Sequence, residues 1–107
     1  MIRIAVVNGR SMTPTLRDGD RVLVRRRRTV HRGDVALVAM PSGWILKRVA
    51  GLPGDAGVPP GTVYLLGDNA GFSVDSRDFG CVPAAWVYGV VVRRLRSTDN
   101  SSNPVSG

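Results

Sequence analysis

The sequence contains few of the side chains on which many enzymes depend. Its one cysteine, Cys81, excludes an internal disulfide and cannot build a metal site alone. Its one histidine, His31, stands in a polar segment between Val30 and Arg32, which argues against a Ser-His-Asp triad and a histidine-rich metal site. We therefore expect no metal and no cofactor.

Long apolar runs and aromatic clusters are also missing. No segment approaches the roughly 18 consecutive apolar residues of a membrane span, and the chain begins with the strand-like MIRIAVV instead of a signal peptide. Aromatic residues make up 6%, and none lies among the clustered arginines, so a stacking platform for single-stranded nucleic acid is not supported. The 107 residues, 43% of them hydrophobic, suffice for one soluble domain with a single modest core.

Positive charge, by contrast, is plentiful, and the formal net charge is +7. The densest part is the run Arg25, Arg26, Arg27 and Arg28. We interpret this run as solvated turn residues, with a peripheral contact to an anionic membrane as the open alternative. No nucleic-acid partner is expected.

Short apolar and β-branched segments separated by Gly, Pro and Asp predict an all-β protein. The six expected strands are 2–7, 21–25, 35–40, 44–50, 62–66 and 87–92. One helical turn is expected at 82–86 and an irregular polar loop at 70–77. The pattern indicates a single barrel-like domain over residues 1–96 and a polar tail, 97–107, that we expect to be disordered.

Lys47 is the only lysine among 15 lysine and arginine residues, and it lies inside an apolar run from Trp44 to Ala50. Arginine does not lose its proton in a protein, whereas a desolvated lysine amine does so readily. A neutral amine in apolar surroundings is a general base. The alternative is a lysine that extends from a strand edge to water.

A possible nucleophile lies upstream. Ser11 follows the first expected strand and a turn that contains Gly9, and Pro14 fixes the chain beyond it. A serine held on such exposed backbone has amide N–H groups nearby that are free to point at a ligand. The sequence thus offers a nucleophile and a base without a histidine.

Four segments carry motifs in a fixed order. They are 11–16 (SMTPTL), 33–35 (GDV), 47–55 (KRVAGLPGD) and 67–77 (GDNAGFSVDSR). Together they resemble the motifs of the signal peptidase I family, serine endopeptidases that use a Ser-Lys dyad. The resemblance covers roughly residues 8–92. It implies a compact, barrel-like signal-peptidase catalytic core.

The resemblance also implies roles for individual residues. Ser11 falls on the nucleophile and Lys47 on the general base, and Ser73 falls on the serine whose hydroxyl orients the lysine amine. The Ser11 backbone N–H would be the oxyanion donor. Some family members add a hydroxyl two residues before the nucleophile, where this chain has Gly9, so a second donor of that kind is not expected.

Other matched residues are expected to support the site. Their set comprises Met12 near the cleavage pocket and the charged pairs Arg48 with Asp68 and Asp75 with Arg77. For each charged pair, a solvated turn is the alternative. Cys81 is interpreted as a small buried residue, because no base is identifiable near it.

The chain also departs from the family pattern. It has no membrane-spanning helix, and only residues 56–66 stand where many members insert a large β domain. This minimal core most resembles the small soluble proteases that remove the leader from nickel-type superoxide dismutase precursors. A cytoplasmic location, with possible peripheral membrane contact, would follow.

Three alternatives remain at this point. The first is a signal peptidase proper, which cuts secretory leaders at a membrane and prefers small residues one and three positions before the cut. The second is the self-cleaving repressor branch, which needs an upstream DNA-binding domain. The third is a catalytically inactive basic module that binds nucleic acid or membrane.

Overall fold

The computed structural model describes residues 1–95 and the backbone of 103–106, and β-strands dominate it. The strands are β1 (Ile2–Asn8), β2 (Arg21–Arg26), β3 (Val35–Met40), β4 (Gly43–Gly51), β5 (Thr62–Leu66), β6 (Val82–Pro83), β7 (Val87–Leu95) and β8 (Asn103–Ser106). Helical segments are short: η1 (Ala70–Phe72), α1 (Ser76–Phe79) and η2 (Ala84–Trp86). The all-β prediction is confirmed, and each of the six expected strands is present.

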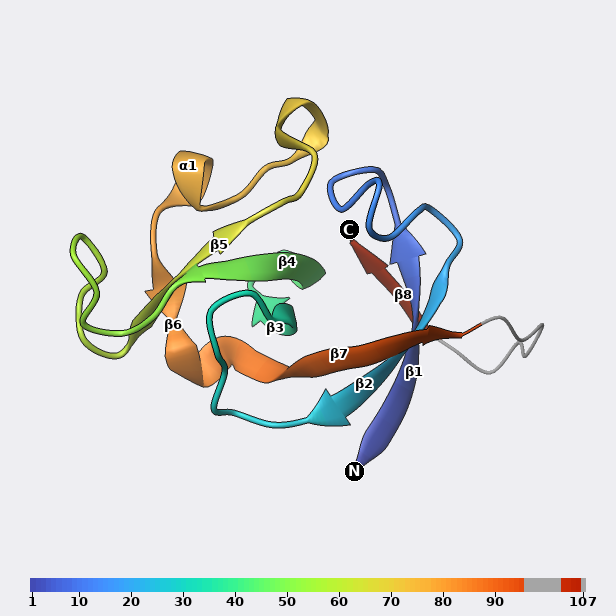
Figure 1. The fold of residues 1–107 in the computed structure, drawn as a ribbon, viewed down its shortest axis with the longest axis horizontal. Coiled ribbons are helices and arrows are strands. Elements are labelled where there is room, and N and C mark those ends of the chain that lie inside the picture. Colours follow the sequence, from blue (N-terminus) through green and yellow to red (C-terminus); the bar gives the residue numbers. More distant parts are fainter. Residues whose placement is uncertain (96–102, 107) are drawn as a thin grey trace.

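The strand pairings form a circuit. The order β3-β7-β2-β1-β8-β4 returns to β3 through a direct β3–β4 pairing, and β5 and β6 continue from β4. Neighbouring strands run antiparallel, except that β8 is parallel to both β1 and β4. Figure 1 shows β1, β2 and β8 at one end of the molecule and β5, β6 and α1 at the other. These pairings give the barrel-like arrangement that the sequence predicts.

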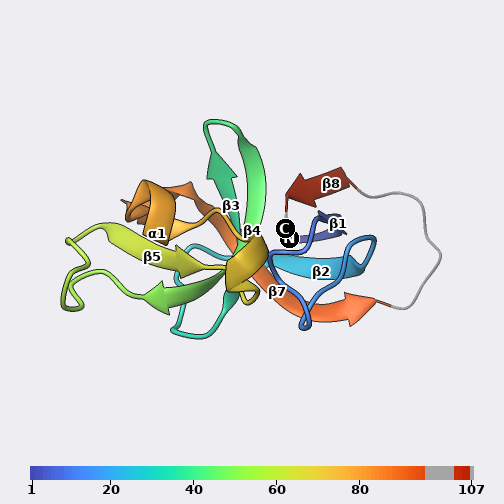
Figure 2. The same ribbon diagram turned by 90° about the horizontal axis from the view of Figure 1, so that it is seen from above.

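The hairpin of β3 and β4 lies between two apolar clusters, which explains the nearly continuous apolar sequence of β3. Val35 and Leu37 pack into a cluster with β1 and β2, whereas Ala36 and Val38 pack into a second one with β5 and β7. Successive side chains of a strand point to opposite faces, so this hairpin joins both halves of the core. Figure 2 shows it extending between them.

Two regions differ in detail from the sequence prediction. The loop expected at 70–77 contains η1 and the first half of α1, whose N-cap is Asp75. Asp75 accepts from the Arg77 N–H while its own N–H donates to Asp78, so a capping box stabilises this short helix. The helical turn expected at 82–86 is shorter in the structure: η2 covers 84–86, and residues 82 and 83 form β6.

The tail expected to be disordered, 97–107, falls partly on residues outside those that the structure describes. Within it, Asn103–Ser106 form β8, where the sequence predicts no strand. Backbone pairing with two other strands can order a segment that has little apolar surface of its own.

Among residues 1–95 and 103–106, no helix has the length and apolar character needed to cross a bilayer.

Candidate active site

Ser11 and Lys47, 36 positions apart in the sequence, meet in the interior. The Lys47 Nζ and Ser11 Oγ atoms are 2.8 Å apart, which is hydrogen-bond distance. The two residues are only 3% and 1% exposed. The two candidates chosen from sequence are therefore in direct contact and shielded from bulk water.

The turn after β1 holds Ser11 in place. Gly9 adopts a positive φ of 93°, which favours glycine, and its N–H donates to Asp18 Oδ1 at 2.8 Å. The Ser11 carbonyl accepts from the Asn69 N–H at 2.8 Å. No hydrogen bond from the Ser11 N–H occurs among the described residues, and its role as an oxyanion donor remains a prediction. The Gly9 N–H, by contrast, is already used.

Lys47 is placed by β4, where it lies opposite Ala36 of β3. Burial lowers the pKa of the Lys47 amine, because the charged form loses hydration. The Asp75 carboxylate acts in the opposite direction, and the Arg77 guanidinium adds a further lowering effect. Burial is the largest of these effects, so the neutral amine is favoured relative to a lysine in water.

The segment that follows β5 packs closely against the nucleophile. A Cβ added to Gly67 would lie 2.1 Å from Ser73 Oγ and 2.7 Å from the Ser11 carbonyl oxygen. Any side chain at position 67 would therefore push these groups apart. Gly67 is part of a motif in the sequence, but only the structure shows why a glycine is needed at this position.

Ser73 and Asp75 are linked beneath the dyad. Ser73 Oγ donates to Asp75 Oδ2 at 2.8 Å. A hydroxyl that donates its proton keeps two acceptor lone pairs, and these are available to an amine hydrogen. The orienting role of Ser73 toward Lys47 remains a prediction.

Asp75 is completely buried and accepts five hydrogen bonds. The donors are the Gly67 N–H, the Ser73 hydroxyl, the Arg77 N–H and the Arg77 Nε and Nη2 groups. The Arg77 guanidinium is the largest cause that holds the pKa of Asp75 far below its usual range. The Asp75–Arg77 pair that the sequence predicts is thus a structural anchor for the segment carrying Ser73.

The second predicted pair is also formed. Arg48 donates to Asp68 through Nε at 2.9 Å and Nη2 at 2.6 Å, a two-point contact of fixed geometry. Thr15 Oγ1 donates to the same carboxylate at 2.5 Å. The pair therefore ties the strand that carries Lys47 to the segment just after Ser11.

The remaining predicted residues lie in the core or at the surface. Met12 is fully buried in the cluster of β1 and β2, and it is not among the residues that line the pocket at Lys47. Cys81 is half-buried. Arg25 and Arg26 end β2 as exposed residues, and the Arg26 guanidinium lies 5.0 Å from the centre of the Tyr88 ring.

Known proteins match this chain over nearly all of its described length. Residues 1–56 and 55–95 match the family described as signal peptidase, peptidase S26. The chain belongs to the signal peptidase family. It is therefore a serine peptidase of the signal-peptidase type by descent.

Individual members of this signal peptidase family show the same likeness. Mitochondrial inner membrane protease subunit 1 of Schizosaccharomyces pombe is 33% identical over 89% of this chain and 74% of its own length. The same subunit of Xenopus tropicalis is 35% identical over 86% and 68%, respectively. Signal peptidase I V of Bacillus subtilis is 30% identical over 79% and 80%.

Two pockets lie near Ser11 and Lys47, one lined by Lys47 itself and the other by Arg10, which precedes Ser11. The first, here called the Lys47 pocket, has a volume of about 310 Å³. Its lining residues are Met40, Ser42, Ile45, Lys47, Phe72, Val74 and Phe79. Phe72 and Val74 are 60% and 69% exposed, although both are apolar. The motifs in the sequence do not single out Phe72 and Val74, whose one signal is the presence of apolar side chains in a polar loop.

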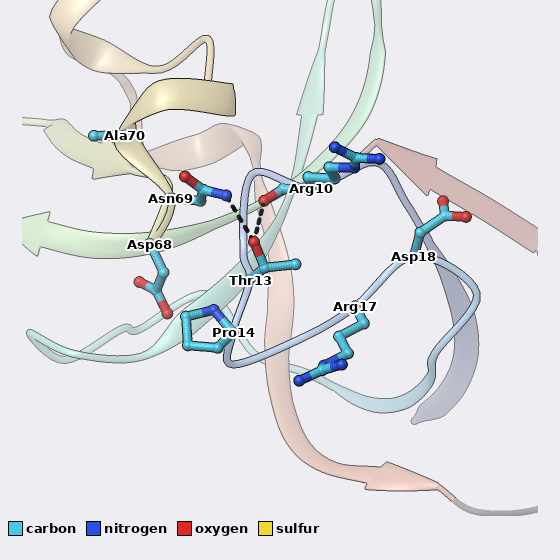
Figure 3. Close-up of a pocket in the computed structure, with 8 residues that line it drawn as sticks. All are labelled: Arg10, Thr13, Pro14, Arg17, Asp18, Asp68, Asn69 and Ala70. Atoms are coloured by element: carbon cyan, nitrogen blue, oxygen red, sulfur yellow. Dashed lines mark hydrogen bonds between the residues drawn. The ribbon is translucent and has the colours of Figure 1, made fainter.

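The second pocket, here called the Arg10 pocket, has a volume of about 620 Å³, and most of the residues that line it are charged or polar. Figure 3 shows Thr13 at its centre, accepting from Asn69 Nδ2 at 2.7 Å and donating to the Arg10 carbonyl at 2.9 Å. Ala70 lines this pocket and Phe72 lines the Lys47 pocket, so η1 contributes to both.

Proposed function

We propose that this protein is an endopeptidase that removes an N-terminal leader from a protein precursor by means of a Ser11–Lys47 dyad. One observation carries the proposal. The only lysine of the chain is buried 2.8 Å from the hydroxyl of the motif serine. An amine at this distance from a serine hydroxyl can accept the hydroxyl proton once the amine is neutral.

The reaction begins with the neutral Lys47 amine. It accepts the Ser11 hydroxyl proton while Oγ bonds to the carbonyl carbon of the scissile peptide. The carbonyl oxygen takes the negative charge and accepts a hydrogen bond from the Ser11 N–H. As the C–N bond breaks, the Lys47 ammonium returns the proton to the leaving amine, and an acyl ester on Ser11 remains. Water then attacks the ester, again with Lys47 as base, and releases the leader.

Ser73 completes this arrangement as a positioning residue. Its hydroxyl is fixed by donation to Asp75, and a lone pair that accepts from Lys47 would aim the amine lone pair at Ser11. Five hydrogen bonds keep the Asp75 carboxylate ionised and in place. The orientation of the base therefore depends on a rigid, charged anchor.

The substrate class follows from the family and the pockets. The Lys47 pocket, which apolar side chains such as Phe72 and Val74 line, suits the residues before the cut, and the Arg10 pocket suits those after it. Among precursors with a leader, we favour the nickel-type superoxide dismutase precursor, because only residues 56–66 stand where many family members insert a large β domain. Relatives named for an inner membrane and for signal peptidase favour a secretory-type leader as the second candidate, with Arg25, Arg26, Arg27 and Arg28 touching an anionic membrane.

The test is cleavage of both precursors by the wild type, Ser11→Ala and Lys47→Arg over a range of pH. We expect each variant to lose at least about 10³-fold in kcat/KM. Lys47→Arg is the sharper variant, because it keeps the charge and removes only the ability to act as a base. Wild-type activity should rise with pH as Lys47 loses its proton.

Different outcomes separate the levels of this proposal. An active Lys47→Arg variant with an unchanged pH profile would eliminate the dyad. Cleavage of a secretory leader but not of the nickel superoxide dismutase precursor would keep the dyad and discard that substrate. Unfolding curves of all variants serve as the control for a lost fold.

A further inference from the structure

The last described strand, β8, has an unusual position. Its residues pair with β1 in parallel, from Ala5 opposite Asn103 to Asn8 opposite Ser106. On its other side, Ser106 pairs with Ile45 of β4. A four-residue segment with almost no apolar content thus fills the place between the two strands that carry the site (Figure 1).

β8 runs in the direction that leads toward Ser11 and Lys47. β1 leads into the turn that holds Ser11, and β4 leads through Lys47. Ser106 lies opposite a residue three positions before Ser11 and another two positions before Lys47. At about 3.3 Å per residue, a chain running past Ser106 in the same direction needs only roughly 7–10 Å to reach the dyad.

A leader must follow the same direction. The carbonyl that Ser11 attacks belongs to the last residue of the leader, so the leader runs from its N-terminal side toward the dyad. Extended peptides bind to open strand edges through backbone hydrogen bonds, and β1 and β4 present such edges to β8. A leader on this path and β8 would need the same backbone groups.

We propose that β8 is an intramolecular competitor, which occupies the path of the leader and must leave before a precursor binds. This inference rests on the proposed function, because it assumes that a leader is bound. The occupant is the chain's own segment 103–106, and what it blocks is the backbone edge of residues 5–8 and of Ile45.

The composition of the tail suits a displaceable occupant. Pro104 has no N–H and cannot donate to either neighbour. The pairing with β4 involves one residue pair, and the pairing with β1 involves four. The tail 97–107 has few apolar side chains that could stabilise β8 by burial. Such a segment can be replaced by a peptide that also fills the Lys47 pocket.

The kinetic test compares the full chain with a truncation after Ser102 on a synthetic leader peptide. An occupant that is bound about two thirds of the time raises the apparent KM roughly threefold, so truncation should lower KM by that factor or more. The value of kcat should not change, because β8 is absent from the productive complex in both proteins. Val105→Pro, which removes one strand N–H, should act in the same direction, and Ser101→Pro before β8 is the matched control.

A second measurement does not depend on catalysis. Hydrogen exchange in the Ser11→Ala background should show faster exchange, after truncation, of the amides of residues 5–8 other than Val7, whose N–H donates to the Asp20 carbonyl and not to β8. A peptide of the sequence 97–107, added in excess, should restore their protection. If neither the full chain nor the truncated chain cuts a leader, the proposed function fails. The exchange measurement still decides whether β8 can leave its place between β1 and β4.

Three outcomes would overturn the inference. The first is an unchanged KM in the truncated chain together with unchanged exchange at residues 5–8. The second is a truncated chain that no longer folds, since β8 would then be a permanent wall of the sheet. The third is a fall in kcat, since β8 would then contribute to the reaction itself.

Discussion

Lys47 and Asp75 are both buried and lie close enough to affect each other's charge, yet the protein treats them in opposite ways. Asp75 accepts five hydrogen bonds, and its pKa is far below the usual range. The pKa of Lys47 is lowered by burial, which disfavours its charged form. The surroundings of Asp75 therefore stabilise its ionised form, whereas those of Lys47 favour its neutral form. An enzyme that uses lysine as a base needs both.

The largest effect on stability should come from Asp75→Asn. The variant loses the charge that five donors stabilise, and we expect the free energy of unfolding to fall by about 3 kcal/mol at pH 7. Chemical denaturation measures this value. Because the folded pKa of Asp75 is lowered, its contribution is present above the ordinary Asp value and is lost as pH falls below about 4. The difference between wild type and variant should shrink there.

Asp78→Asn is the matched control for this substitution. Asp78 is an exposed member of the same capping box, so its replacement should cost no more than about 1 kcal/mol. Equal losses in the two variants would mean that the cap, and not the buried anchor, is what stabilises this region.

Gly67→Ala should have the next largest effect. The added Cβ would meet Ser73 Oγ at 2.1 Å and the Ser11 carbonyl at 2.7 Å, so the two sides of the site must separate. Overpacking of this kind costs about 2 kcal/mol and should lower kcat more than it raises KM. Gly71→Ala is the control, because its nearest atom lies at 3.9 Å. Similar behaviour of the two variants would disprove close packing at Gly67.

The main strands and the two candidate catalytic residues could be predicted from the sequence, because the signals for them are local. The six main strands follow from apolar alternation and turn residues, and the unusual use of one lysine singles out Lys47. The motif serine provides its partner. What was not predictable is long-range: the reason for Gly67, the exposed apolar residues Phe72 and Val74, and the strand β8.

The prediction for the tail shows why. Residues 97–107 have the composition of a disordered segment, and nothing in their side chains specifies a strand. The pairing of 103–106 comes from the open edges of β1 and β4, which are formed by residues about 60 to 100 positions earlier. Backbone hydrogen bonds do not depend on side-chain identity, so composition alone does not reveal them.

Lys47→Met tests the opposite side of the comparison, and its effect on stability should be smaller and favourable. Removing an amine that is costly to charge should raise the free energy of unfolding by about 1 kcal/mol while abolishing cleavage. A lowered folded pKa means that the cost is fully present below that pKa and disappears as pH rises to the ordinary lysine value near 10.4. The gain should therefore be greatest at low pH. A loss of stability at every pH would show that Lys47 is structural.

The smallest expected effect concerns the coupling between the two regions. Arg77 lowers the pKa of Lys47 directly through its positive charge. It also pairs with Asp75, whose negative charge raises the pKa of Lys47, and so weakens that opposing effect. Arg77→Gln removes both influences in the same direction, so the pKa of Lys47 should increase and the acid limb of the kcat profile should move to higher pH. Asp75→Asn should move the same limb to lower pH, because the carboxylate no longer favours the ammonium. Profiles of kcat against pH for the two variants measure these shifts, and a common direction would contradict electrostatic coupling between the anchor and the base.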